Sequence, residues 1–285
     1  MSNAANRKIR KLDHSERWFR DGLAACRPPA FSESLEVDVS RVRDLIAASR
    51  ERGSHLTYAH VLVRAAALAL SSNPDLHAMV CGGKVHYPSQ VDIALSVNAP
   101  TSVAPIMVIR SADQKNLIAV ADEIVRRVPE VQEEHERLLA ILRRWGWLLP
   151  FGFLRRRLLV LLFRSVEFRR KGSGTFQVSI VPGVDTIATP LFSSCAILTA
   201  GKAKDRVIAL NGEPAVRPTI HLTCSADHRA WNGHDCQTFL LAVQQILQSG
   251  KLDSEISPMT LEPLLQIIVT SPQPRAASPA PSKLP

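Results

Sequence analysis

Cysteine is scarce in this sequence of 285 residues, and the cysteines present are poorly spaced for metal or disulfide chemistry. None belongs to a C-x-x-C pair, and their number is odd. Zinc sites and redox motifs use closely spaced pairs, whereas disulfide frameworks use an even number. We therefore predict no bound metal and five reduced thiols, as in a cytoplasmic protein. The five are Cys26, Cys81, Cys195, Cys224 and Cys236.

Long apolar runs are missing as well. The N-terminal stretch "MSNAANRKIRKLDHSERWFRD" is polar and has no apolar segment of the kind that forms the centre of a secretory signal. No window of about 18–20 residues is both apolar and free of charge, as a membrane-spanning helix requires. We expect neither a secretory signal nor an ordinary spanning helix.

Acidic residues are almost absent from one segment. Residues 137–171 carry ten basic side chains and a single acid, Glu167, so this segment accounts for the whole net charge of +9. The charge lies among leucines and not on a polar face. The basic balance of the chain therefore describes one segment, and we do not expect a nucleic-acid-binding protein.

Hydrophobic periodicity predicts both helices and strands in the first half of the chain. We expect a charged helix over residues 8–26, a strand at 34–40, and a helix from Ser40, its N-cap, to Gly53. A buried helix at 56–76, a hairpin of strands at 91–97 and 103–109, and a helix at 111–128 capped by Ser111 or Asp113 follow.

The second half is expected to be richer in strands. A strand is predicted at 175–181, followed by three strands up to the aspartate and histidine at 227–228, with a turn at "LNGEP" and a helix at 234–249. Residues 1–270 are expected to form one domain, and the Pro/Ala/Ser-rich residues 271–285 a disordered tail. The elements together predict an α/β or α+β sandwich, a mixed sheet flanked by helices.

One short stretch combines residue types that suit proton transfer. "SADHRAWNGHDC", residues 225–236, places His228 after the apolar strand "TIHLTC" and before a glycine-containing turn and a helix. A neutral imidazole accepts a proton at pH 7, as a general base must. Most loop histidines are nevertheless structural or solvated, so the residues by themselves leave both interpretations open.

Several stretches, in the same order along the chain, resemble a known family. "DHRAWNG" is similar to the D-H-R-x-x-D-G signature of the catalytic domain of 2-oxo acid dehydrogenase acyltransferases (E2 components), a fold like that of chloramphenicol acetyltransferase. "GTFQVSI" at 174–180 and "CAILTAGKAKDRVIALNGEPAVRPTIHLTCSADHR" resemble strands of that domain, and "LTYAHVLVRAAALALSSNPDLHA" resembles its first core helix. The similarity covers roughly residues 8–128 and 172–250.

The resemblance implies direct acyl transfer from a CoA thioester, acetyl by default, to a hydroxyl, thiol or amine. CoA would then be a co-substrate, and no cofactor would be permanently bound. His228 stands where the family's base stands, and Ser179 stands where the family's serine donates to the tetrahedral oxyanion. Without the resemblance, Ser179 would be interpreted as a mid-strand serine bonded to backbone.

Two further residues are placed by the resemblance, and the first departs from the family pattern. Asn232 replaces an aspartate that orients the catalytic loop; an amide can hold the loop by hydrogen bonds, but it pairs with arginine only weakly. Arg20 aligns loosely with an arginine that braces this loop, and a solvated helix charge is the alternative. In the family the site lies between subunits of a trimer, which implies a homotrimer or a multiple of it.

The segment 137–174 has no counterpart in the family, which usually has a short link here. Two apolar runs alternate with arginine clusters and are broken by Gly146, Pro150 and Gly152. We consider three roles: a peripheral membrane contact, a helical hairpin packed over the trimer, and a lid that lines the acceptor channel. We also expect a free-standing enzyme, because the sequence has no room for a lipoyl domain or a subunit-binding domain.

A second class of function remains open. Asn232 and the segment 137–174 would also suit a non-catalytic, E2-like oligomeric scaffold or a membrane-associated assembly protein. A scaffold needs neither His228 nor Ser179, so the presence of both favours the acyltransferase.

Overall fold

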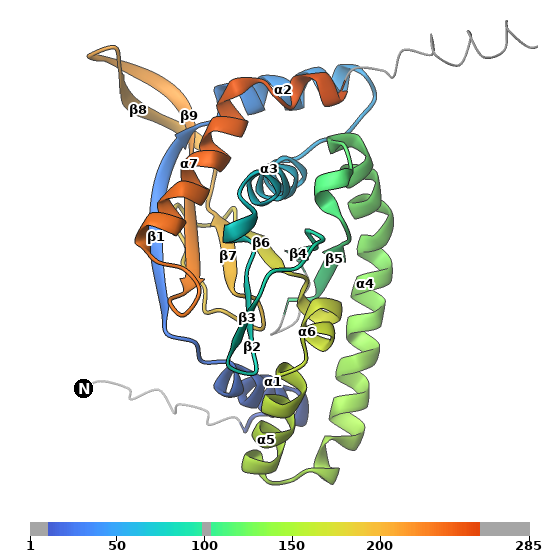
Figure 1. Ribbon diagram of the computed structural model, residues 1–285. Coiled ribbons are helices and arrows are strands. Elements are labelled where there is room, and N and C mark those ends of the chain that lie inside the picture. Colours follow the sequence, from blue (N-terminus) through green and yellow to red (C-terminus); the bar gives the residue numbers. More distant parts are fainter. Residues whose placement is uncertain (1–10, 99–103, 257–285) are drawn as a thin grey trace, which may run out of the picture.

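The computed structural model describes residues 11–98 and 104–256, and in this part of the chain it shows a seven-stranded mixed sheet (Figure 1). The strand order is β1-β9-β7-β6-β4-β5, and β8 pairs with β9. The β4–β6 and β6–β7 pairs are parallel, and the other pairs are antiparallel. The predicted mixed sheet is confirmed, whereas the predicted tail and domain end lie outside the described residues.

The strands agree in place with those predicted. The hairpin of β4 and β5 and the turn at Asn211 and Gly212, which joins β8 to β9 with positive φ at both residues, are confirmed. The strands are β1 Ala30–Asp38, β4 Ile93–Ser96, β5 Ile106–Ile109, β6 Phe176–Ile180, β7 Ala196–Ala200, β8 Lys204–Leu210 and β9 Glu213–Asp227, with a separate pair, β2 Met79–Cys81 and β3 Lys84–His86.

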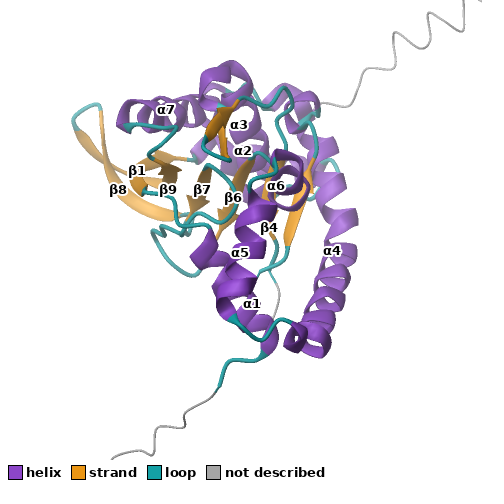
Figure 2. Cartoon of the chain, turned by 60° about the horizontal axis from the view of Figure 1, so that its bottom comes forward, coloured by secondary structure: helices purple, strands orange, loops and turns teal. Residues whose placement is uncertain are grey.

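Helices lie on both sides of the sheet. Figure 2 shows α2, α3 and α7 on one side and α1 and α5 on the other, with α4 along the edge beyond β5. The helices are α1 His14–Ala25, α2 Ser40–Glu51, α3 Tyr58–Ser72, α4 Leu117–Trp145, α5 Gly152–Phe163, α6 Val166–Ser173 and α7 Gly233–Ser249, and short 3-10 turns are η1 Pro74–Leu76, η2 Ala112–Gln114, η3 Gly146–Leu148 and η4 Asp253–Ile256. No helix of the described residues is long and apolar enough to cross a membrane.

The main core lies between the sheet and the first group of helices. The predicted buried helix 56–76 appears as α3, whose Val61, Val63 and Ala65 have no exposed surface. Phe176 of β6 packs against Trp231 and Phe239 at ring-centroid distances of 6.4 and 4.9 Å. The alternation of β6 thus turns Phe176 and Val178 toward the helices and Gln177 and Ser179 toward the opposite face.

Two predicted helix starts are wrong. Ser40 is the first helical residue and not the N-cap, because the carboxylate of Asp38 accepts hydrogen bonds from the Ser40 backbone N–H and hydroxyl at 2.8 and 2.7 Å. Neither Ser111 nor Asp113 caps α4. Both flank or lie in η2, and the α4 cap is Asn116, whose side chain accepts from Ala119 N–H at 2.8 Å.

The end of α4 is also later than predicted. The helix continues from the expected end at 128 through Pro129 to Trp145. Proline removes one helical hydrogen bond, here the one to the carbonyl of Val125. Val125 is 61% exposed, so its turn faces solvent, where water can satisfy that carbonyl. The first apolar run of the segment 137–174 is therefore a continuation of a core helix.

Candidate active site

His228 is held at the end of β9 by three contacts. Its backbone N–H donates to the carbonyl of Pro29 at 2.8 Å, and its ring lies against Phe31 with centroids 4.8 Å apart. Its Nδ1 lies 3.0 Å from the carbonyl of Trp231. A carbonyl only accepts, so this bond places the proton on Nδ1 and leaves the lone pair on Nε2. The imidazole is thus oriented as a base, and the residue is exposed.

Asp227 and Arg229, on either side of His228, stiffen the loop. The Arg229 guanidinium donates to both carboxylate oxygens of Asp227, with Nε–Oδ1 2.9 Å and Nη2–Oδ2 2.6 Å. Asp227 is buried, and its hydrogen bond raises the pKa of Arg229. The two neighbours of His228 in the sequence therefore hold each other in place.

The cysteines near this loop are poor nucleophiles. Burial, followed by the negative charge of Asp227, raises the pKa of Cys195 to about 12. Burial also raises the pKa of Cys224 well above its ordinary value and raises that of Cys26. Since the thiolate is the reactive form, these thiols do not suit covalent catalysis. The geometry favours a base that activates an incoming acceptor.

Asn232 acts as the N-cap of α7. Its side-chain oxygen accepts from Asp235 N–H at 3.1 Å, and the Asp235 carboxylate accepts from Asn232 N–H at 2.9 Å, a reciprocal capping box. Trp231, the preceding residue, is buried between Phe176 and Phe239. Asn232 thereby fixes where α7 begins and holds the turn that carries the carbonyl facing His228.

Ser179 lies on the face of β6 that points away from the core. The residue is 9% exposed, and its hydroxyl makes no hydrogen bond to any described residue. The alternative of a serine bonded to backbone is therefore wrong within this part of the chain. Two residues earlier on the same face, Gln177 accepts from the Ser194 hydroxyl at 2.8 Å, which leaves its amide N–H groups as further donors.

Ser179 borders a cavity of about 710 Å³, called the apolar cavity below. Its walls are mostly aliphatic and aromatic and come from α1, the hairpin β4–β5, the outer half of α4, and α5. Leu138 and Leu142 of α4 and Leu159 of α5 belong to the segment 137–174. The segment 137–174 thus supplies part of the wall of the cavity next to Ser179 and also packs on α1, and its role stays a prediction.

One chain does not bring His228 and Ser179 together. In the sheet register, Ser179 of β6 is paired with Thr199 of β7, and Thr199 is paired with Thr223 of β9. His228 follows Thr223 by five residues. At strand spacings this amounts to about 16 Å along the strands and about 10 Å across them. The two side chains cannot act on one substrate atom unless a second copy of the chain supplies one of them.

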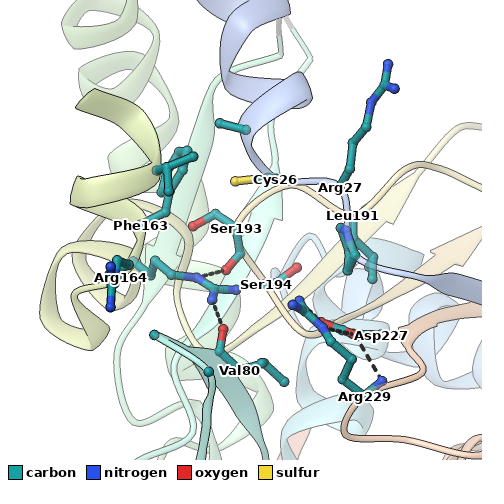
Figure 3. A pocket seen from close by; sticks show the side chains of 16 residues that line it. Cys26, Arg27, Val80, Phe163, Arg164, Leu191, Ser193, Ser194, Asp227 and Arg229 are labelled. Atoms are coloured by element: carbon teal, nitrogen blue, oxygen red, sulfur yellow. Dashed lines mark hydrogen bonds and ion pairs between the residues drawn. The ribbon is translucent and has the colours of Figure 1, made fainter. Parts of the chain in front are cut away.

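A second, polar pocket adjoins the His228 loop. This arginine pocket, of about 470 Å³, is lined by four arginines and one aspartate, among them Arg27, Arg164 and the pair Asp227–Arg229 (Figure 3). Arg27 and Arg164 make no ion pair with any residue in 11–98 or 104–256. The Ser193 hydroxyl is buried without a hydrogen-bond partner there, and Ser193 has a φ of 70°. The pocket has the charge and donors to hold an anion.

A family model matches residues 23–137 and 174–252 of the chain and describes the 2-oxoacid dehydrogenases acyltransferase catalytic domain. The chain belongs to this acyltransferase family. The match breaks off between residues 137 and 174, where the arginine- and leucine-rich segment stands. The predicted family is thus confirmed on the stretches that carry both Ser179 and His228.

Curated members of the family are similar over most of this chain. The lipoamide acyltransferase component of the branched-chain alpha-keto acid dehydrogenase complex of Bacillus subtilis is 27% identical over 221 residues, 75% of this chain and 46% of that protein. The dihydrolipoyllysine-residue succinyltransferase component of the 2-oxoglutarate dehydrogenase complex of Escherichia coli K12 is also 27% identical, over 75% of this chain and 47% of that protein. The chain thus spans about half the length of these relatives.

Solved structures of the family share the fold. A probable dihydrolipoamide acetyltransferase from Listeria monocytogenes superimposes with a TM-score of 0.69 at 20% identity and covers 90% of this chain and 99% of its own. A dihydrolipoamide acetyltransferase from Azotobacter vinelandii gives 0.66 at 17% identity, covering 88% and 97%. The work on the latter concerned the roles of a serine, a histidine and an asparagine four residues after it in its catalytic mechanism.

The family model does not match residues 138–173, the interior of the segment 137–174. A buried ion pair helps to hold these residues in place. Asp21 of α1 has no exposed surface, and Arg155 of α5 donates to it through Nε at 2.8 Å. Arg155 also donates to the carbonyls of Leu149 and Pro150, and Arg156 adds a 3.1 Å bond to Asp21. Arg155 is therefore a structural arginine and not a solvated one.

Arg20 does not brace the His228 loop within one chain. Its side chain is 56% exposed, and its ion pair is with the neighbouring Asp21 at 3.6 Å. Sequence reasoning also missed Gln177, the arginine pocket and the Asp21–Arg155 pair. Only Gln177 had a usable signal, because residues two apart on a strand share a face and Gln177 precedes Ser179 by two.

Proposed function

We propose that this protein is a CoA-dependent acyltransferase that moves an acyl group, acetyl by default, from a thioester to a hydroxyl, thiol or amine. One observation carries the proposal: the Trp231 carbonyl binds Nδ1 of His228 and leaves Nε2 as a proton acceptor. A base in this tautomer does not need a thiol or serine nucleophile to begin acyl transfer. In support, a fold neighbour was studied for the roles of a serine, a histidine and an asparagine in its catalytic mechanism, the same residue types as Ser179, His228 and Asn232.

The reaction then takes two steps. Nε2 of His228 removes the proton of the acceptor as the acceptor atom attacks the thioester carbonyl, and the Ser179 hydroxyl donates to the oxygen that becomes negative. The tetrahedral intermediate collapses, the carbon–sulfur bond breaks, and the imidazolium returns its proton to the CoA thiolate. One such donor is worth about 3–4 kcal/mol of barrier in related sites.

We propose that the working unit is a homotrimer or a multiple of it. Support comes from the separation of His228 and Ser179 along the sheet, because a site with both needs two chains. The hairpin of β8 and β9 projects from the body (Figure 1), and the paired Val207 and Val216 on it are 71% and 67% exposed, as in a surface that a partner covers. A fold neighbour is the cubic core of a pyruvate dehydrogenase complex.

The arginine pocket supports CoA as the donor, because CoA carries phosphates and the pocket beside His228 has an excess of positive charge. If this pocket binds those phosphates, Arg27→Ala and Arg164→Ala will raise KM for acetyl-CoA. Neither variant will change the kinetics with acetyl-pantetheine, which lacks the nucleotide. Equal effects on both donors would remove the pocket from the donor site.

The test of the proposed function is acyl transfer from acetyl-CoA to dihydrolipoamide, a thiol acceptor. The release of CoA is measured by chromatography. The relatives' names suggest this acceptor. His228→Ala will lower kcat about 100- to 10,000-fold, and Ser179→Ala about 100- to 1,000-fold. Full turnover by His228→Ala would show that the base is assigned wrongly.

A non-catalytic scaffold or membrane-associated assembly protein is the second candidate. It is favoured by a group of exposed apolar side chains in and beside α5, including Trp147, Phe151, Phe153 and Leu161. Calorimetric titration with CoA separates the candidates, because an enzyme binds in the micromolar-to-millimolar range and a scaffold does not bind. Flotation with anionic liposomes, compared between the wild type and a Phe151→Ser/Phe153→Ser variant, tests the membrane contact. We propose a cytoplasmic location; five thiols without a disulfide support it.

A further inference from the structure

The apolar cavity is larger than an acetyl group requires. Its volume of about 710 Å³ falls in the range of sites for drug-sized ligands, roughly 300–1,000 Å³. A methyl group is comparable in size to a water molecule, whose share of liquid volume is about 30 Å³. An acetyl group bound at Ser179 would therefore leave most of this space without ligand atoms.

As the oxyanion donor, Ser179 would hold the thioester carbonyl at the rim of the cavity. An oxyanion donor must lie within hydrogen-bond distance of the carbonyl oxygen. The acyl substituent is bonded to the same carbon as that oxygen. When Ser179 binds the carbonyl, the substituent therefore starts at the rim of the apolar cavity, and the aromatic and aliphatic walls from α1, α4 and α5 can receive it.

We propose that the apolar cavity is the acyl-chain site and that the preferred donor is a CoA thioester of an apolar acyl chain longer than acetyl. This inference rests on the proposed function, because it uses Ser179 as the oxyanion donor. The segment 138–173, which the family model leaves unmatched, supplies Leu138, Leu142 and Leu159 to the site. It thereby acts as a specificity element for the donor.

Gly172 of α6 offers a direct way to fill the cavity. It lines the space, and a Cβ at this position would meet no atom within 4 Å. Gly172→Phe therefore introduces a ring at the cavity wall with room around its first atom. Gly172→Ala is the matched control for the backbone, and Leu161→Phe, on the exposed side of α5, is the control for an added ring elsewhere.

The experiment measures kcat/KM for acetyl-, butyryl-, hexanoyl- and octanoyl-CoA. Each buried methylene should raise kcat/KM about fourfold in the wild type, until the cavity is filled. Gly172→Phe should lower the octanoyl-to-acetyl ratio at least about tenfold, while Gly172→Ala and Leu161→Phe keep it. A wild type that prefers acetyl-CoA, or a Gly172→Phe variant with an unchanged ratio, would overturn the inference.

A binding measurement separates this inference from the proposed function. Octanoate titrated into His228→Ala should bind, and the same titration into Gly172→Phe should show at least about tenfold weaker binding. If the wild type releases no CoA from any of the four thioesters, the proposed function has failed. If catalysis depends on His228 but octanoate does not bind, the acyl-chain site has failed. A smaller oligomer of Gly172→Phe by light scattering would show that a neighbouring chain fills the cavity, which also overturns the inference.

Discussion

A buried carboxylate, Asp21, helps to attach the segment 138–173 to the rest of the molecule. Asp21 has no exposed surface, and the Arg155 side chain that pairs with it is 4% exposed. Arg20 and Arg156, which also approach Asp21, are 56% and 52% exposed. The change to make is Asp21→Asn, which keeps the shape of the side chain and leaves the Arg155 charge buried without an anion.

The expected loss follows from this difference in burial. Removal of one partner of a buried ion pair costs about 3–5 kcal/mol, whereas an exposed pair contributes about 0–1 kcal/mol. Asp21→Asn should therefore lower the free energy of unfolding by about 3–5 kcal/mol and Arg156→Met by at most about 1 kcal/mol. Asp21→Leu combined with Arg155→Met should recover part of the loss, since it removes both charges but leaves the Leu149 and Pro150 carbonyls without this donor.

The pair also predicts a pH dependence. Burial would raise the pKa of Asp21, but hydrogen bonds from Arg155 and Arg156 outweigh it and hold the pKa below its ordinary value of 3.8. The carboxylate therefore contributes stability that is fully present above pH 3.8 and is lost as the pH falls through the lower, folded-state pKa. Asp21→Asn should lack this part of the acid transition.

The assay is urea unfolding at pH 7, monitored by circular dichroism. The protein concentration is kept fixed, because oligomers unfold at midpoints that depend on concentration. Trypsin cleavage after the arginines of α5 gives a local readout, and it should be faster in Asp21→Asn than in Arg156→Met. If both variants lose the same stability, the buried pair does not hold this segment and the reasoning is refuted.

Three further outcomes are expected. Asn232→Ala should lower the free energy of unfolding by about 1 kcal/mol in urea titrations, while Asn232→Asp should not, because both Asn and Asp cap α7; equal losses would contradict the capping role. Cys195, whose pKa is raised to about 12, should react with a thiol reagent at pH 8 only after unfolding, and rapid labelling of the native protein would contradict its burial. Gly201→Ala should yield little folded protein, because its Cβ would lie 1.9 Å from the Asp185 carbonyl oxygen; soluble expression at the wild-type level would refute this.

Local patterns were enough to predict much of this protein. Alternating apolar residues placed β1, apolar stretches placed β6 and β9, the Ala- and Leu-rich run placed α3, and Asn211–Gly212 placed the turn between β8 and β9. The stretch around His228, together with the strand that carries Ser179, identified the family. These features depend on residues close together in the sequence, and their period is visible in the order of the amino acids.

The candidate site could be predicted only in part. The residue types of Ser179 and His228 were visible, but the free Nε2 depends on a carbonyl that the buried Trp231 places, and the free Ser179 hydroxyl depends on what lies across the sheet face. Asn232 was interpreted as a substitute for a loop-bracing acid, and the structure adds its role as a helix cap.

The sequence alone did not determine how the segment 137–174 packs in the fold. Its composition determined that it is helical, basic and apolar, which left three roles open. The tertiary structure determined its contacts. The helix α4 continues through Pro129 because that turn faces solvent. Arg155 of α5 pairs with Asp21, which lies more than 130 positions away in the sequence. The cost of burying an unpaired charge makes such a contact necessary, but only the folded chain shows which carboxylate meets it.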